Sequence, residues 1–218
     1  MHACKVVWPG RIFLRRMIDL LCCFRKHVHP IRINAEFAKD LEWWFQFFAR
    51  WNGVSIFLVP GLEPPSDVEV TSDAAGAVGY GAYWRNEWFN GKWPADQNQR
   101  SIGFKELFPV VLATHIYGDI SGRVTVFYFA LITKRLCQFL DSRTSRDVAL
   151  MHLLRSLLMV AARHSLVFSA VHIAGRCNRI ADALSRFHWQ AFQDLAPDAN
   201  PKLVHLPLQL LGELFSAV

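Results

Sequence analysis

The chain has 218 residues, of which 52% are hydrophobic and 19% are charged. This balance excludes a disordered chain and predicts a folded protein with a large core, to which 17 Phe and 8 Trp contribute. The net charge of +6 favours a polyanionic partner, although a solvated basic surface accounts for it equally well.

No segment resembles a targeting or membrane-spanning sequence. The apolar stretch at 17–24 is interrupted by Asp19 and is not followed by a small-residue cleavage site, so we expect no signal peptide. No apolar run approaches the roughly 20 residues that span a bilayer. The five cysteines form neither a Cys-x-x-Cys pair nor a zinc pattern, which favours reduced thiols. We therefore expect an intracellular protein, cytoplasmic or nuclear, without membrane contact.

Residues 1–59 are expected to form an N-terminal helical segment. The clearest pattern there is a helix capped by Asn34, whose apolar residues recur at spacings of three and four. We interpret this apolar face as facing the core; its members are Phe37, Leu41, Trp44, Phe48 and Trp51. The Pro-rich stretch at 60–67 is the best domain boundary in the chain.

Residues 66–190 form a second predicted domain, in which strand and helix patterns alternate. Strands are indicated by alternating, β-branched and aromatic residues, and are expected at 68–74, 76–84, 87–93, 123–132 and 166–173. Turns near Ala75-Gly76 and Arg85-Asn86 join the first three strands into an antiparallel meander.

Three helices are predicted between and after these strands. Apolar periodicity predicts helices at 104–117, where Pro109 should bend the first turn, and at 146–164. Asn178 is expected to cap a short helix that contains Asp182. The predicted fold class is α/β, a five-stranded mixed sheet with flanking helices, and residues 191–218 are expected to be a linker or tail.

Three acidic residues stand where such a sheet can bring them together. Asp73 ends the first strand, Glu106 begins the first helix and Asp182 begins the last. Carboxylates that converge at one rim can hold two magnesium ions about 4 Å apart against a scissile phosphate. Each acid also has an ordinary interpretation, as a turn residue, a helix-surface acid or a partner of Arg186 at i,i+4.

Four strings of the chain resemble the ribonuclease H domain of retroelement reverse transcriptases, most closely those of DIRS-type elements: VTSDAAGAVGYGAYW, SIGFKELFPVVLAT, DSRTSRDVALMHLLRSLLMVAARHS and HIAGRCNRIADALSR. Residues 1–59 resemble the end of the preceding polymerase region, and LAPDANPKLVHLPLQLL resembles the segment leading toward the recombinase. The resemblance implies a ribonuclease H-like fold, cleavage of RNA in RNA–DNA hybrids, and Mg²⁺ or Mn²⁺ as cofactor. The chain lacks a polymerase palm and a recombinase core, so we expect a fragment of an element or a gene derived from one.

The resemblance also assigns individual residues. Asp73, Glu106 and Asp182 match the first, second and fourth metal carboxylates of the family, and His172 is a candidate proton shuttle. The third carboxylate should lie about twelve residues before Thr144, where this chain has Ile132. Isoleucine offers no oxygen ligand and adds a desolvation cost to a nearby cation. We expect a rate loss of about a thousand-fold or more.

Two functions remain open at this point. One is a nuclease with residual activity on RNA–DNA hybrids; the other, favoured by Ile132, is a non-catalytic nucleic-acid-binding or inert remnant. Three arginines near the last turn are candidate phosphate contacts, with a solvated basic face as the alternative: Arg176, Arg179 and Arg186. Three tryptophans of the meander are expected to pack in the core rather than to stack on bases: Trp84, Trp88 and Trp93.

Overall fold

The computed structural model describes residues 8–24, 30–50, 69–121, 126–131, 133–142, 145, 147–164 and 166–216. The chain divides into two compact units, Met1–Leu62 and Glu63–Val218. The candidate site lies in the second unit.

The first unit contains three described helical segments: η1 (Trp8–Leu14), α2 (Arg15–Cys22) and α3 (Ala35–Arg50). The predicted cap is confirmed, because the Asn34 side-chain oxygen accepts a hydrogen bond from the Phe37 amide at 2.8 Å. The predicted core face of α3 is wrong in part. Trp43 and Trp44 are buried, whereas Leu41 and Phe48 are exposed. The helix is rotated relative to the expected face because Trp43 stacks on Phe13 of η1, with ring centroids 3.7 Å apart. Trp51 lies outside the described residues.

The second unit is built on a sheet with the strand order β3-β2-β1-β4-β5. Its strands are β1 (Glu69–Ala75), β2 (Gly79–Trp84), β3 (Glu87–Lys92), β4 (Val126–Leu131) and β5 (Val167–His172). β2 pairs antiparallel with β1 and β3, whereas β4 pairs parallel with β1 and β5. The predicted turn at Arg85-Asn86 is confirmed: both residues have positive φ, 51° and 66°, as a two-residue hairpin turn requires.

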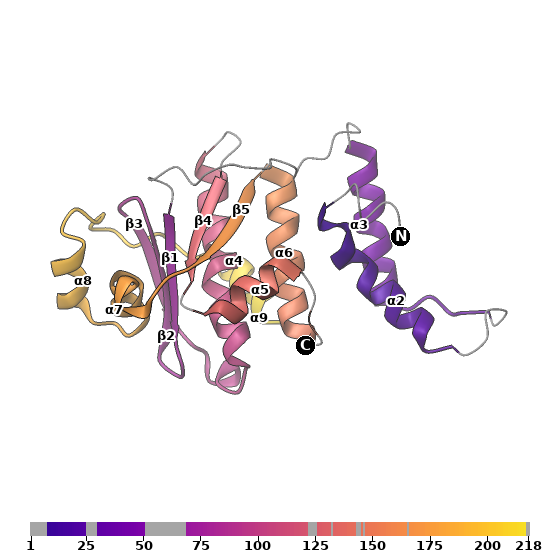
Figure 1. Ribbon diagram of the computed structural model, residues 1–218, viewed down its shortest axis with the longest axis horizontal. Helices are drawn as coiled ribbons and strands as arrows, with labels where there is room; N and C mark the ends of the chain where they lie inside the picture. Colours follow the sequence, from indigo (N-terminus) through magenta and orange to yellow (C-terminus); the bar gives the residue numbers. More distant parts are fainter. Residues whose placement is uncertain are drawn as a thin grey trace. The chain divides into compact units, whose positions relative to one another are not determined.

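Helices cover both faces of the antiparallel strands (Figure 1). On one face α4 (Ile102–Ser121) packs on β1 and β2, and α6 (Val148–His164) packs against α4; on the other face lie α7 (Arg179–Ser185) and α8 (Trp189–Leu195). Successive residues of β2 point to opposite faces of the sheet, and each face contacts a different helix. Tyr80 meets Phe108 of α4 at 4.9 Å, whereas a Cβ on Gly81 would lie 2.6 Å from Leu184 of α7. Gly81 therefore lets α7 pack directly against the strand.

The remaining elements are η2 (Ala95–Gln97), α5 (Lys134–Ser142), η3 (Gly175–Cys177) and α9 (Leu208–Phe215). The chain after α8 runs along the edge strand β3, where the amides of Asn200 and Val204 donate to the carbonyls of Asn86 and Trp88. These bonds use backbone groups that an edge strand would otherwise expose.

The predicted fold class has to be corrected. A sheet with three helices was expected, but helices contain far more of the described residues than strands do, and antiparallel pairing is confined to β1–β3. α5 and α8 were not expected. Both are short, and the packing of a few side chains such as Leu136, Leu140 and Phe192 stabilises them, which periodicity over so few residues does not reveal. α4 is also longer than predicted and continues through Pro109.

Candidate functional site

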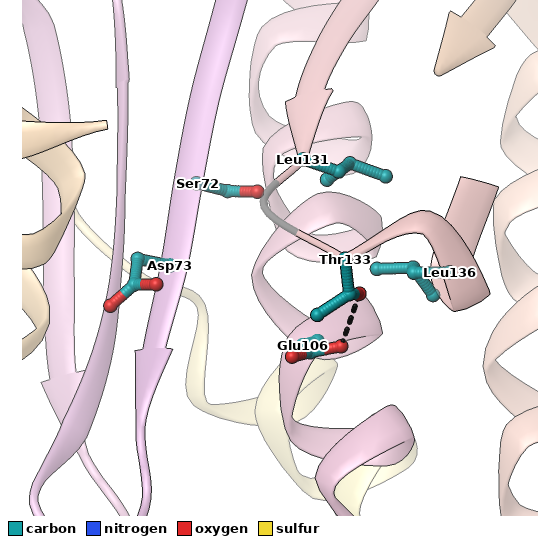
Figure 2. Close-up of a pocket in the computed structure, with 6 residues that line it drawn as sticks. All are labelled: Ser72, Asp73, Glu106, Leu131, Thr133 and Leu136. Atoms are coloured by element: carbon teal, nitrogen blue, oxygen red, sulfur yellow. Dashed lines mark hydrogen bonds between the residues drawn. The ribbon is translucent and has the colours of Figure 1, made fainter. Parts of the chain in front are cut away.

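The site lies where β1 and β4 separate. Their parallel pairing ends at Thr71 and Ala130, so the side chains that follow on each strand line a pocket between them. Six residues line it: Ser72, Asp73, Glu106, Leu131, Thr133 and Leu136 (Figure 2). In sheets with parallel strands, the crevice at the carboxyl ends of the strands is a common ligand site. Asp73 and Glu106, predicted from the sequence, are therefore both present at this pocket.

Asp73 is a buried carboxyl group held by helix α7. It is 7% exposed, and the Ser185 hydroxyl donates a hydrogen bond of 2.6 Å to its Oδ2. Burial raises the pKa of Asp73 above its ordinary value, and the nearby charge of Asp182 adds to this increase. The hydrogen bond from Ser185 and the charge of Arg186 act in the opposite direction. Desolvation is the largest of these effects, so the net result is a raised pKa for Asp73.

Glu106 enters the pocket from α4, on the other face of the sheet. The Thr133 hydroxyl donates a hydrogen bond of 2.7 Å to Glu106 Oε2. In Figure 2 the Asp73 carboxylate points away from the Glu106 and Thr133 side chains. This follows from the strand register, since Asp73 pairs with Gly81, whose face is covered by α7. The two carboxylates line one pocket but are directed to different partners.

Asp182 lies in the first turn of α7 and is close enough to Asp73 to affect its pKa. Its Oδ1 accepts a hydrogen bond of 2.7 Å from Nε of Arg186, one helical turn away. Both side chains are 47% exposed. The i,i+4 contact expected as an alternative is thus present, and the hydrogen bond to Asp182, together with the Asp182 charge, raises the pKa of Arg186.

The other predicted side chains lie at the rim. His172 ends β5 in register with Leu131, which places it at the same edge of the sheet, and it is exposed. Arg176, in η3, and Arg179, at the start of α7, are exposed as well. Ile132, the residue expected in place of the third carboxylate, lies outside the described residues, between Leu131 and Thr133 of the pocket lining.

The acids at this edge of the sheet are each held by a hydrogen bond. Two divalent ions need several oxygen ligands. Asp73 accepts from Ser185, Glu106 from Thr133 and Asp182 from Arg186. Leu131 and Leu136 present hydrocarbon to the pocket. Within the described ranges no three His, Cys, Asp or Glu side chains are grouped closely enough to hold a metal ion.

Thr133 and Ser185 also organise the site and were not singled out from the sequence, and Asn178 was expected there only as a helix cap. Asn178 was expected to cap α7, but its side chain makes no cap hydrogen bond. Its Nδ2 instead donates to the Ser72 carbonyl at 3.0 Å. Asn178 is 2% exposed and Ser185 is fully buried. Both therefore tie α7 to β1. Both residues stand among apolar residues in the HIAGRCNRIADALSR string. This pattern could have predicted their burial, because buried polar side chains form hydrogen bonds.

Comparison with known proteins adds little to this geometry. No protein-family model and no curated protein matches the chain. A solved structure of the foamy viral protease-reverse transcriptase dRH in complex with ds DNA is similar to it at 12% identity, with a TM-score of 0.34. That similarity covers 74% of this chain and 28% of the viral one. At such a TM-score it carries no argument about fold or function.

Among the described helices, none is both long and apolar enough to cross a membrane.

Proposed function

We propose that this chain is a nucleic-acid-binding domain related to the ribonuclease H domains of retroelement reverse transcriptases, with hydrolysis strongly impaired. The observation that carries the proposal is the surroundings of the acids. Asp73 and Glu106 line one pocket together with Leu131 and Leu136, and each accepts a hydrogen bond from a protein hydroxyl. The acids stand at the positions that the family resemblance assigns to metal ligands. Their partners and the neighbouring leucines support binding without efficient cleavage.

Basic residues at the same edge supply the binding part of the proposal. Arg176 and Arg179 are exposed, and Arg186 is half-exposed beside Asp182. Guanidinium groups on a surface neutralise phosphates and release counterions, which accounts for most of the affinity for nucleic acid. An RNA–DNA hybrid is the ligand that the resemblance favours.

Binding is tested by fluorescence anisotropy with a labelled RNA–DNA hybrid. We expect the wild type to bind, and the double substitution Arg176→Ala and Arg179→Ala to weaken binding about tenfold or more. Arg163→Ala is the matched control, because Arg163 is exposed at the end of α6, on the other face of the sheet. A wild type that binds no hybrid would overturn the proposal.

Cleavage is tested with the same hybrid and Mg²⁺ or Mn²⁺. We expect slow or no cleavage by the wild type, and an increase of about a hundred-fold or more for Ile132→Asp, which restores an oxygen ligand. Adding Asp73→Asn to that variant should abolish the gain. Rapid cleavage by the wild type that is lost in Asp73→Asn would show that the site is a working nuclease and that hydrolysis is not impaired.

A further inference from the structure

The corner between α7 and α8, residues 186–189, presents an exposed aromatic ring. Trp189 is the first residue of α8 and is 45% exposed. Its ring meets Phe187 at 5.9 Å and Trp88 at 5.8 Å between centroids. The Phe187 and Trp88 rings contact the indole, and nearly half of the surface of Trp189 remains exposed to solvent. A large aromatic side chain held in this way is a preformed surface for a planar ligand.

The backbone at this corner is fixed in an uncommon conformation. Phe187 has φ of 60°, in the left-handed region that a bulky residue adopts only when its surroundings impose it. Two amides close the end of α7 there, since Phe187 N donates to the Leu184 carbonyl and His188 N to the Ala183 carbonyl. The Phe187 ring lies against Gly79, where an added Cβ would be 2.7 Å from it. The direction of Trp189 is therefore set by packing.

Two basic side chains lie close to Phe187 and Trp189 in the fold or in the chain. Lys92 is exposed, and its Nζ lies 5.7 Å from the centre of the Phe187 ring. Arg186 uses Nε to bind Asp182 and has further N–H donors on its guanidinium. The acid of α8, Asp194, accepts from the Gln190 amide at 3.0 Å. Cations beside a stacking ring are the combination that binds single-stranded nucleic acid.

We propose that the α7–α8 corner binds a single-stranded segment of nucleic acid, with a base stacked on Trp189 and the flanking phosphates on Arg186 and Lys92. The inference rests on the proposed function and adds to it a second contact surface. The two surfaces share Arg186, which also contacts Asp182 in the first turn of α7. A strand that leaves a duplex bound at the pocket edge can thus continue across the corner.

This assignment differs from the stacking surface considered from the sequence. Trp84 and Trp93 are buried, 4% and 6% exposed, as the packing interpretation predicted. Trp88 is half-buried, and its Nε1 donates to the Asn200 carbonyl at 2.7 Å. Only its neighbour Trp189 offers an exposed indole at this corner.

The test measures binding of a labelled single-stranded oligodeoxythymidylate and of a blunt RNA–DNA hybrid. We expect Trp189→Ala and Trp189→Leu to weaken binding of the single strand about tenfold, and Trp189→Phe to keep most of the affinity because it retains a stacking face. Binding of the blunt hybrid should change less than twofold or so in all three variants. Trp189→Leu preserves apolar contact with Trp88, and a melting curve for each variant checks that it remains folded.

Failure of this inference is distinguishable from failure of the proposed function. If the wild type binds both nucleic acids, the arginine variants bind weakly and Trp189→Leu binds the single strand normally, then the corner is not a stacking site although the proposed function stands. A Phe variant as weak as the Ala variant would also overturn stacking. If the wild type binds neither nucleic acid, both proposals are wrong.

Discussion

At the scale of single residues, Asp73 shows how burial and hydrogen bonding decide what an acid can do. Its position at the end of a strand made it a candidate ligand, yet a lone strand-end aspartate is more commonly a turn residue. In the fold it is buried under α7 and hydrogen-bonded to Ser185. Burial raises the pKa of this carboxyl group, whereas the hydrogen bond from the Ser185 hydroxyl lowers it.

The raised pKa of Asp73 gives a pH-dependent prediction. Its ordinary value is 3.8, and the fold raises it, so the folded protein binds this proton more tightly than the unfolded chain does. The contribution of Asp73 to stability is therefore fully present below about pH 3.8 and is lost as the pH rises through the raised value. Asp73→Asn removes this loss while keeping an acceptor for Ser185.

We expect Asp73→Asn to melt about 2 °C or more above the wild type at pH 7, and the difference to shrink as the pH approaches 4. Thermal unfolding followed by circular dichroism over this pH range measures it. The matched control is Asp194→Asn on α8, whose exposed carboxylate should change the melting temperature by less than about 1 °C. An Asp73→Asn variant that is less stable at pH 7 would mean that Ser185 and Arg186 stabilise the carboxylate more than burial opposes it.

At the scale of elements, α7 and α9 show how short helices depend on tertiary contacts. α7 is held to β1 by Asn178 and Ser185, and α9 by aromatic stacking on α4. Neither helix is long enough to be stable alone in water. The periodicity of the long helices predicted α4 and α6, whereas α5 and α8 escaped prediction because a few apolar positions do not define a period.

The contact between α9 and α4 can be tested by removing the Phe215 ring. Phe215 stacks on Phe108 with centroids 4.5 Å apart and an interplanar angle of 7°. We expect Phe215→Ala to lower the free energy of unfolding by about 2 kcal/mol, through lost apolar burial and ring contact. Leu208→Ala on the same helix is the control, since Leu208 is 81% exposed and its loss should cost less than about 0.5 kcal/mol. Chemical denaturation provides both values, and equal values would show that α9 is not held by this stack.

At the scale of the whole molecule, the net charge of +6 favours nucleic acid without saying where it binds. The three arginines proposed to contact phosphates, Arg176, Arg179 and Arg186, all lie in or beside η3 and α7 of the second unit. In the first unit, Arg16 forms ion pairs with Glu36 and Asp40.

Salt dependence separates this contact from a diffuse basic surface. We expect Arg179→Ala to reduce the slope of log affinity against log salt by about 1 for an RNA–DNA hybrid, the value for one phosphate contact. Arg163→Ala should leave the slope unchanged. Titrations at several salt concentrations measure both slopes. Equal slopes for the two variants would show that binding is spread over the surface rather than localised at the α7 edge.

The sequence by itself determined the strands, the long helices and the acids at their ends, because these depend on local periodicity and on motif strings. The resemblance to ribonuclease H domains also predicted that Ile132 takes the place of a third carboxylate, and Ile132 lies outside the described residues. Only the tertiary structure decided that Asp73 is turned to Ser185 and Glu106 to Thr133, and that Trp189 rather than a meander tryptophan is exposed. The direction of a side chain depends on strand register and on the helix packed against it. Those arise from contacts between residues distant in the chain, which local sequence does not encode.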